Sequence, residues 1–308
     1  MILFYGCPDD DPLTRAVAAA RAAGVDHLLL DQTRLARYDL VCGPGLAGRV
    51  GAEGRTVPLD AVTAVYARPL DPPADRADPA ARARTAAFHG WFTDWLDTAD
   101  ALVVNRPRAM ESNGSKPYQA QLIARAGFAV PDTLVSDDPE EIRAFHRGHG
   151  RVVYKSLSGI RSIVRELTEA DGARLHLVRA LPTQFQAYVP GRDVRVHVVG
   201  ERVFAAAVDC AAIDYRYAGR DGLHAELSRY ELPPEVAERS VALAAGLGLS
   251  LAGIDLRVRP DGTWVCFEVN PMPAYSYYES HTGLPIAAAL VELLAAADLG
   301  AAPARVEV

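Results

Sequence analysis

Cysteine is scarce in this sequence, and its few copies are scattered. The 308 residues contain four, at Cys7, Cys42, Cys210 and Cys266. A structural zinc site needs closely spaced cysteine pairs, and a disulfide framework needs a denser set in a short chain. The scatter therefore argues against both, and we expect four reduced thiols that pack as small apolar residues.

Long apolar runs and concentrated basic segments are missing as well. No apolar stretch approaches the roughly 20 residues that span a bilayer. The net charge is −7, and no Lys/Arg cluster offers an electrostatic footprint for a nucleic-acid backbone. Residues 1–6 have no basic leader, so they predict a first strand rather than a signal peptide. We expect a cytoplasmic protein whose partners include neither nucleic acid nor a membrane.

Apolar residues make up 50% of the chain, which is enough for a sizeable core and predicts two or three packed subdomains. The N-terminal third alternates strand-like and helix-like patterns, as in a small parallel α/β unit. We expect strands at residues 2–6, 27–31, 39–42 and 62–66. A later helix has a core-facing stripe formed by Phe88, Trp91, Phe92 and Trp95.

Small polar and basic residues follow a strand in the middle of the chain. The apolar run at residues 152–154 ends in Lys155, and the loop behind it contains Ser158, Gly159 and Arg161. Such a loop can fold its N–H groups and hydroxyls over phosphate oxygens, although it lacks the spacing of a Walker-type loop. A lysine at the end of a strand is also commonly just solvated, and that alternative stays open.

Residues 252–270 are the most informative segment. Two alternating patterns flank residues 260–262, Pro-Asp-Gly, which are a strong reverse-turn signal. A symmetric two-residue loop at Asp261 and Gly262 would set the register of the resulting hairpin. That register pairs Val258 with Val265, Leu256 with Phe267, and Asp255 with Glu268.

The hairpin brings two carboxylates and an amide together. Asp255 lies opposite Glu268, and Asn270 shares their face because side chains alternate along a strand. Opposed like charges destabilise a sheet unless something compensates them, and a hard cation such as magnesium would do so. The alternative is that the two carboxylates are solvated and paired separately with Arg257 or Arg259.

A second hairpin is predicted around residues 200–201. On its first strand Asp193 and Arg195 project to one face. Arginine suits the charge that develops on a transferred phosphoryl group, and aspartate suits a ribose hydroxyl. A simple surface ion pair is the alternative.

The order of these segments resembles the ATP-grasp superfamily over roughly residues 100–295. The matching segments are 112–131, 152–155, 185–189, 193–195, Asp255 and 268–271. The closing segments, 270–273 and 278–286, resemble those of the ribosomal-protein S6 glutamate ligases and of the graspetide (microviridin-type) ligases that cyclise ribosomal peptides. The resemblance implies an α+β ATP-grasp fold, in which two α/β subdomains clasp ATP behind a small N-terminal α/β domain. We expect boundaries at 1–104, 105–190 and 191–308.

The resemblance also implies ATP and one or two Mg²⁺ ions as cofactors. It assigns to ATP the residues Lys116, Lys155, Ser158, Gly159, Arg161, Gln186, Ala187, Tyr188, Val189, Asp193, Arg195 and Phe267. Residues 186–189 would read adenine, largely through backbone groups of Ala187 and Val189. The metal ligands would be Asp255, Glu268 and Asn270, and the catalytic residues Arg195, Lys155 and Arg257.

The implied reaction is an attack of a substrate carboxylate on ATP, which gives ADP and an acyl phosphate, followed by nucleophilic displacement of phosphate. Our leading hypothesis is a carboxylate–amine ligase for an amino acid, a small acid or a peptide. The first alternative is a peptide-modifying ligase that forms side-chain ester or amide cross-links in a ribosomal precursor. The second is a non-catalytic nucleotide-binding protein.

The acceptor side of the site is the least defined by sequence. Residues that could surround a substrate are Arg216, Arg257, Tyr275, Tyr278, Glu279 and His281. An arginine among them could clamp a carboxylate, but the tyrosines are equally compatible with packing, and a lone histidine is commonly structural. The carboxylate and the nucleophile stay open. ATP-grasp enzymes commonly form dimers or tetramers, so a homo-oligomer is compatible with the sequence.

Overall fold

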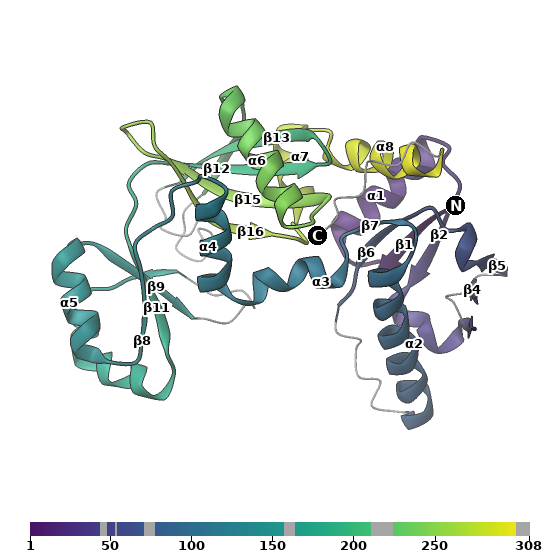
Figure 1. Cartoon of the computed structure of the whole chain (residues 1–308), viewed down its shortest axis with the longest axis horizontal. Coiled ribbons are helices and arrows are strands. Elements are labelled where there is room, and N and C mark those ends of the chain that lie inside the picture. The colour runs from purple at the N-terminus through teal and green to yellow at the C-terminus, as the bar shows by residue number, and fades with distance from the viewer. Residues whose placement is uncertain (44–47, 53, 71–77, 157–163, 211–223, 300–308) are drawn as a thin grey trace.

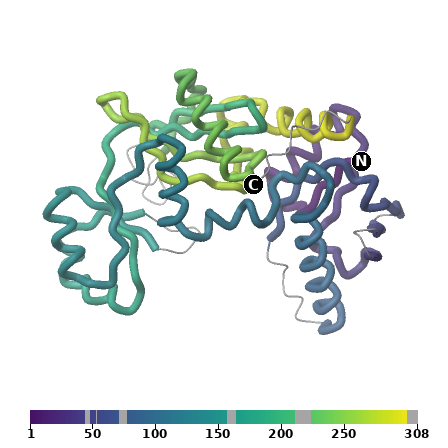
Figure 2. Tube along the Cα trace, viewed as in Figure 1, coloured from purple at the N-terminus to yellow at the C-terminus, as the bar shows by residue number. Residues whose placement is uncertain are grey.

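The computed structural model describes residues 1–43, 48–52, 54–70, 78–156, 164–210 and 224–299. Three regions are evident in Figure 1, with the N-terminal region at one end, a central region at the other, and the C-terminal region between them. The trace in Figure 2 shows how the C-terminal helix returns to lie against the N-terminal region. No described helix combines the length and the apolar character needed to cross a bilayer.

The N-terminal region is built on a parallel four-stranded sheet in the order β2-β1-β6-β7. Its elements are β1 (Ile2–Gly6), α1 (Asp11–Ala22), β2 (His27–Asp31), β6 (Ala64–Arg68), α2 (Pro79–Thr98) and β7 (Leu102–Val104). Phe88, Phe92 and Trp95 of α2 are buried in one core cluster with this sheet, and Trp91 packs partly buried against it. The predicted core stripe is therefore confirmed.

One predicted strand belongs to a different sheet. β3 (Asp39–Cys42) pairs antiparallel with β4 (Gly48–Ala52), which pairs with β5 (Arg55–Pro58). The prediction that residues 39–42 join the parallel unit is wrong. A parallel neighbour needs a crossover of about a dozen residues or more, whereas only the 3-10 helix η1 (Gln32–Arg37) and Tyr38 separate β2 from β3. A second short turn, η3 (Leu59–Ala61), leads into β6.

The central region is an antiparallel sheet in the order β10-β9-β11-β8, with a helix and a 3-10 helix on one face. The chain reaches it through α3 (Pro107–Met110), η4 (Glu111–Gly114) and α4 (Lys116–Arg125). Its elements are β8 (Thr133–Ser136), α5 (Pro139–His149), β9 (Val152–Ser156), β10 (Arg165–Glu166), η5 (Glu169–Ala180) and β11 (Thr183–Ala187). Val152 and Phe185 pack with Ile142 of α5 and Leu175 of η5, so the opposite face of the sheet is left for polar side chains.

The C-terminal region is a five-stranded antiparallel sheet in the order β14-β13-β12-β15-β16. Its strands are β12 (Arg192–Val199), β13 (Arg202–Asp209), β14 (Glu226–Tyr230), β15 (Leu251–Val258) and β16 (Trp264–Asn270). Helix α6 (Pro234–Gly246) covers the face to which Val194, Val196 and Val198 point. Because side chains alternate along β12, the residues between these valines project to the other face.

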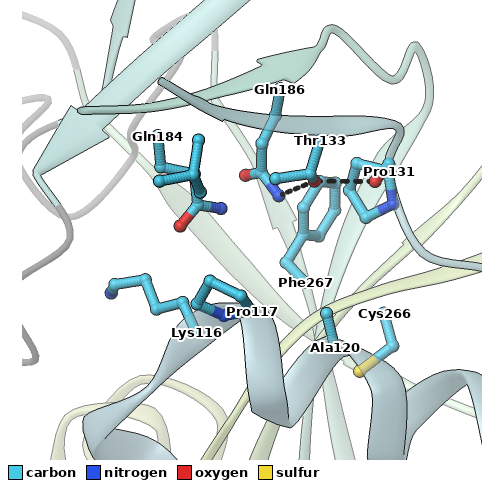
Figure 3. A pocket seen from close by; sticks show the side chains of 10 residues that line it. Lys116, Pro117, Ala120, Pro131, Thr133, Gln184, Gln186, Cys266 and Phe267 are labelled. Carbon is cyan, nitrogen blue, oxygen red and sulfur yellow. Dashed lines mark hydrogen bonds between the residues drawn. The ribbon is translucent and has the colours of Figure 1, made fainter. Parts of the chain in front are cut away.

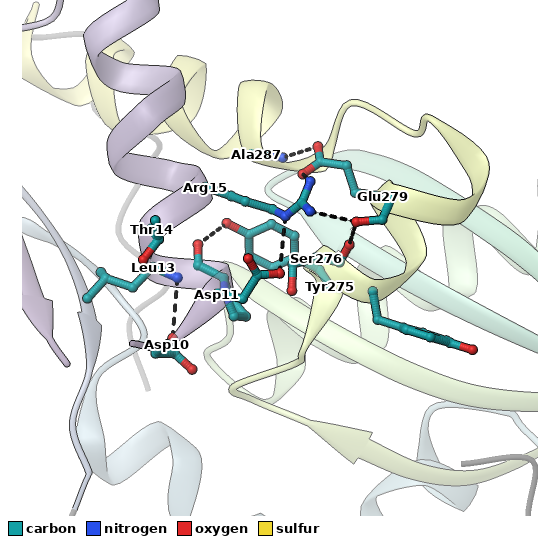
Figure 4. A network of polar contacts seen from close by, with 12 residues as sticks. Asp10, Asp11, Leu13, Thr14, Arg15, Tyr275, Ser276, Glu279 and Ala287 are labelled. Carbon is teal, nitrogen blue, oxygen red and sulfur yellow. Dashed lines mark hydrogen bonds and ion pairs between the residues drawn. The ribbon is translucent and has the colours of Figure 1, made fainter. Parts of the chain in front are cut away.

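The N-terminal and C-terminal regions share one hydrophobic core. Helices α7 (Tyr275–Thr282) and α8 (Ile286–Asp298) pack with α1, β1 and β6 in a single cluster of buried residues. Polar contacts reinforce it. Arg15 of α1 donates to Ser280 at 2.6 Å, and the Tyr275 hydroxyl donates to the Pro12 carbonyl at 2.5 Å. Figure 4 shows Arg15 and Tyr275 at this contact. The N-terminal region and the helices α7 and α8 are therefore packed together as one body.

The cysteines are free thiols, as predicted. Cys266 is buried, Cys7 and Cys210 are half-buried, and Cys42 is exposed. The expectation of a buried apolar environment therefore holds for Cys266 but not for Cys42.

Candidate functional site

Helix α4 is fixed against strand β16 by one buried glutamine. The Gln119 side chain donates to the Val269 carbonyl at 2.8 Å and accepts from the Val269 N–H at 3.0 Å. Gln119 is 3% exposed, so both bonds are shielded from water. This pairing places the first residue of the helix, Lys116, beside the strand, and its Nζ lies 3.8 Å from Glu268 Oε2.

The turn between β15 and β16 is longer than predicted. The Arg259 N–H donates to the Thr263 carbonyl and the Gly262 N–H donates to the Arg259 carbonyl, each at 2.9 Å. Gly262 has a φ of +83°, as expected of the glycine that closes a three-residue hairpin loop. The predicted pairs next to the turn are therefore wrong by one residue, and the observed pairs are Val258 with Trp264 and Leu256 with Cys266.

A β-bulge restores the register at the carboxylates. The pairing shifts between Leu256 and Asp255, so that Asp255 lies opposite Glu268 as predicted. Phe267 is the extra residue of the bulged strand. It lines a cavity together with Lys116, and Lys116 also contacts Glu268, so two consecutive side chains of β16 approach the same lysine.

Three charged residues lie side by side on neighbouring strands, an arginine followed by two carboxylates. Arg195 on β12 pairs with Asp255 on β15, and Asp255 pairs with Glu268 on β16. The Arg195 Nη1 donates to Asp255 Oδ1 at 2.6 Å. Asp255 thus has a cationic neighbour, but it is Arg195 and not the Arg257 or Arg259 of the alternative considered above.

The donor set fits magnesium. Among the described residues, no group of three or more His, Cys, Asp or Glu side chains could hold a metal ion. Magnesium, however, commonly takes only one or two carboxylates and completes its shell with phosphate oxygens and waters. Asp255 and Glu268 are two carboxylates on adjacent strands that would suit this role. Asn270 Oδ1 already accepts from the Met272 N–H at 2.9 Å, which fixes the amide while leaving it a second lone pair.

Arg257 ties the strand to the segment that follows β11. Its Nε and Nη2 donate to the two carboxylate oxygens of Asp193 at 2.7 and 2.8 Å, and its Nη1 donates to the Val189 carbonyl at 2.7 Å. All three donor groups therefore face protein atoms. This arrangement favours a positioning role for Arg257 over the catalytic one expected from the resemblance, and it occupies one lone pair on each oxygen of Asp193.

The polar face of the central sheet lies opposite α4 and β16 across a cavity of about 200 Å³. Gln184 pairs with Lys155 in the sheet, and Gln186 pairs with Val153 and Thr133, so these side chains share that face. Figure 3 shows Gln184 and Gln186 pointing from β11 toward Lys116 and Phe267. The lining residues are Lys116, Pro117, Ala120, Pro131, Thr133, Val135, Gln184, Gln186, Cys266 and Phe267.

The cavity has the chemistry of a nucleotide site. Gln184 Oε1 is buried without a hydrogen-bond partner in the described structure, and such an orphaned acceptor suits a ligand donor. Gln186 donates to the Thr133 hydroxyl at 3.0 Å. Lys155 is 8% exposed and therefore is not the freely solvated lysine of the alternative. Burial raises the pKa of the Cys266 thiol, so this residue remains a neutral apolar wall.

The predicted adenine segment is partly engaged within the protein. The Ala187 N–H donates to the Asp132 carbonyl and the Tyr188 N–H donates to the Arg151 carbonyl, each at 2.9 Å. The Arg151 guanidinium also lies over the Tyr188 ring in a cation–π contact, with its carbon 3.7 Å from the ring centroid. If this segment recognises adenine through its backbone, the groups left for the base are the Ala187 carbonyl and the Val189 N–H.

The predicted acceptor residues separate into two groups. Tyr278 lies at the site, since its ring centroid is 4.9 Å from that of His197 and 5.6 Å from the guanidinium carbon of Arg195. Tyr275 is 0% exposed in the core shared with the N-terminal region, where the packing alternative holds. Glu279 accepts from the Ala287 N–H at 3.0 Å and faces α1 and α8 (Figure 4).

The remaining candidates contribute little to the described site. His281 is exposed and hydrogen-bonded to the carbonyl of Tyr277 in its own helix. Four predicted residues lie outside the described part of the chain, namely Ser158, Gly159, Arg161 and Arg216.

The structure adds residues that the sequence interpretation missed, namely Gln119, Gln184, His197 and Gly253. Gln184 could have been found, because it lies two residues before Gln186 on the same strand face. Gly253 also carries a signal, since a glycine inside a strand commonly marks a close approach. Gln119 and His197 carry none, because their roles depend on partners far away in the sequence.

Two sheets that face each other, with Lys155 on the central sheet, Lys116 on the side of β16 and a carboxylate pair on β15 and β16, are typical of the ATP-grasp ligase class. Residues 114–294 match the model of the RimK-like ATP-grasp domain, and the chain belongs to this family. The predicted family and fold are thus confirmed, and the protein is an ATP-grasp ligase.

Known relatives agree with this placement. A probable alpha-L-glutamate ligase of Aliivibrio salmonicida (strain LFI1238) is 30% identical over 203 residues, which cover 62% of this chain and 66% of that protein, a little under two thirds. The ATP-grasp ligase PsnB, solved with a phosphomimetic variant of a minimal precursor, Mg and ADP, is 29% identical, with a TM-score of 0.80 over 96% of this chain and 98% of PsnB. The macrocyclase MdnC of Microcystis aeruginosa MRC, solved with the precursor peptide MdnA, shares the fold at 22% identity, with a TM-score of 0.79 over 95% of this chain and 98% of MdnC.

Proposed function

We propose that this protein binds ATP and magnesium between its central and C-terminal sheets and joins a carboxylate of an amino acid, a small acid or a peptide to an amine. The observation that carries the proposal is the convergence of Lys116 and Glu268 with the polar face of β11 around one cavity. Cation, carboxylate and buried amide groups come there from elements that are far apart in the sequence. Such a set suits phosphates and their metal ion.

Bound ATP would supply the phosphoryl group, and magnesium would neutralise its negative charge. Lys116 and Lys155 are placed to hold phosphate oxygens. Arg195 approaches from the other side of Asp255 and would stabilise charge on the transferred group. The substrate carboxylate would attack the γ-phosphorus and expel ADP, after which the amine would attack the acyl carbon and expel phosphate. Asp255, Glu268 and Asn270 would hold the metal.

We propose the unit boundaries 1–104, 105–190 and 191–308, with the nucleotide between the second and the third unit. The shared core supports treating the first and the third units as one rigid platform. The central unit has its own smaller core, so it is the part free to move over a bound nucleotide.

Product analysis tests this function. The full-length protein is incubated with ATP, magnesium and a pool of amino acids, small acids and amines, and ADP, AMP and phosphate are measured. ADP and phosphate that appear only with the pool would support ligation, and subdividing the pool then identifies the substrates. AMP with pyrophosphate would overturn the proposed mechanism.

A peptide-modifying activity is the second candidate, and one observation favours it. The likeness to PsnB extends over 96% of the chain, whereas the glutamate ligase alignment covers 62% of it. A short precursor-peptide gene beside this one would supply the substrate to test. Mass spectrometry separates the two activities, because each cross-link removes one water from the peptide, whereas ligation of a free amino acid increases its mass.

A further inference from the structure

Gly253 has no side chain, and the Arg195 guanidinium occupies the space where one would lie. It lies inside β15, opposite His197 on β12 and Asn270 on β16. A Cβ atom at this position would lie 2.0 Å from Arg195 Nη2 and 2.7 Å from Arg195 Cζ. It would also lie 2.6 Å from the Cβ of Pro273, so the guanidinium is enclosed on that side as well. Glycine is needed here for room, because any side chain would displace the arginine head group.

His197 contacts the same guanidinium at the Nε of Arg195. The histidine is 0% exposed, and the Arg195 Nε donates to His197 Nε2 at 3.5 Å. Accepting through Nε2 requires the neutral tautomer that carries its proton on Nδ1. Burial, and then the charge of Arg195, lower the pKa of this imidazole well below its usual value, so the ring remains an acceptor.

The guanidinium is thus contacted on several sides by different elements. Nε faces His197, Nη1 donates to Asp255 at 2.6 Å, and Nη2 lies over the Gly253 backbone. The ring of Tyr278, which packs on His197, lies beside the guanidinium. A long arginine side chain loses conformational freedom when it is immobilised on binding. Here the fold immobilises it in advance.

We propose that His197 and Gly253 are positioning residues that form an arginine seat, which fixes the Arg195 guanidinium for phosphoryl transfer. The inference rests on the proposed function for what Arg195 acts on, while the seat itself is a property of the folded chain. Neither residue touches the nucleotide or the substrate in this account. Their effect is preorganisation, which counts only where charge develops in the transition state.

The first arm of the test needs no substrate. In isotopically labelled full-length protein, the Arg195 Nε–H resonance is assigned by its absence in Arg195→Lys. We expect His197→Leu to shift this resonance and to increase its exchange with water about tenfold, as for the loss of one hydrogen bond. His197→Gln keeps an acceptor near the position of Nε2 and should retain most of the protection. Val198→Ala, on the opposite face of β12, controls for lost stability and should leave the resonance in place.

The second arm uses ADP formation from ATP and magnesium with the substrate pool described above. Gly253→Ala should lower kcat on the order of 10²-fold by displacing the guanidinium, with the KM for ATP changed less than about threefold. His197→Leu should lower kcat about tenfold, and His197→Gln should recover most of the loss. A residue with a purely structural role would not show this rescue.

Three results would overturn the seat: an Arg195 resonance unchanged in both His197→Leu and Gly253→Ala, kcat losses no larger than that of Val198→Ala, or no recovery in His197→Gln. If the wild-type protein forms no ADP with either the pool or a precursor peptide while the resonance responds as expected, the seat is supported and the proposed function fails. The two ideas can therefore be judged separately.

Discussion

At the scale of single residues, the site is a set of oppositely charged pairs between neighbouring elements. Arg195 pairs with Asp255, Lys116 with Glu268, and Arg257 with Asp193. None of these six side chains is more than 24% exposed, so removing one partner leaves a poorly solvated charge. Such changes cost far more than the loss of an exposed surface pair.

Glu268→Gln tests the metal assignment. The change keeps the shape of the side chain and removes its charge, so the affinity for ADP in the presence of magnesium should fall on the order of 10²-fold, since the ion supplies several kcal/mol of charge stabilisation. Binding of ADP without magnesium should change much less. Titration calorimetry measures both affinities, and Glu226→Gln on the exposed edge strand β14 is the control. ADP formation unaffected in Glu268→Gln would remove this residue from the metal site.

Arg257→Lys tests whether Arg257 positions or catalyses. A lysine cannot make the paired bonds to Asp193 together with the bond to Val189. We expect the KM for ATP to rise about tenfold while kcat changes less than about threefold, because the segment after β11 loses its anchor. Steady-state kinetics measure both constants, with Arg259→Lys in the exposed turn as the control. A large fall in kcat at constant KM would instead return Arg257 to the catalytic role implied by the family resemblance.

At the scale of elements, the site depends on how α4 and β16 are held relative to each other. Gln119 makes the two bonds to Val269 that fix the helix on the strand. The bulge at Phe267 then sets which side chains of β16 face the helix. A helix and a strand edge thus act as one unit, and the position of Lys116 follows from it.

Gln119→Leu should separate these two elements. It leaves a buried N–H and a buried C=O of Val269 unsatisfied, which costs about 2–4 kcal/mol of unfolding free energy. ATP affinity should fall as well, since Lys116 loses its fixed place. Urea denaturation and ATP titration measure the two effects. Gln121→Leu, on the exposed face of the same helix, should change neither the unfolding free energy nor the ATP affinity. Equal stability of the two variants would contradict the role of Gln119 in fixing α4 on β16.

At the scale of the whole molecule, the N-terminal and C-terminal regions are joined by the core between α1, α7 and α8 and by a polar network at its edge. Asp11 belongs to that network (Figure 4). A hydrogen bond from Ser276 lowers the pKa of its carboxyl below the ordinary value of 3.8, and Arg15 contributes to the same shift. The contact therefore stabilises the packing of α1 on α7 only while Asp11 is ionised.

Stability should depend on pH through this contact. Because the pKa is lower in the folded state, the stabilisation is fully present above 3.8 and is lost as the pH falls through the lowered value. Asp11→Asn should cost about 0.5 kcal/mol at neutral pH, a small figure because the pair is exposed, and the difference from wild type should vanish in acid. Denaturant unfolding across this range measures it. Asp9→Asn is the nearby control, and a pH-independent difference for Asp11→Asn would contradict the assignment.

Much of the fold could be predicted because its signals are local. Periodicity gave the aromatic stripe of α2, and turn chemistry gave both hairpins. The opposition of Asp255 and Glu268 was predicted through a register that is wrong beside the turn. A three-residue loop shifts the strands by one position and the bulge at Phe267 shifts them back, so two local irregularities compensate.

The sequence by itself determined the family and the order of the elements. It also determined the candidate residues on β12, β15 and β16, because alternation along a strand depends only on near neighbours. Only the tertiary structure decided that β3 leaves the parallel sheet, that Tyr275 is core, and that Arg257 faces Asp193 and Val189. The same holds for the close approach of Arg195 to Gly253 and for the burial of His197. Each of these depends on contacts between residues that are far apart in the sequence, and no local pattern encodes which distant segment will pack against a given side chain.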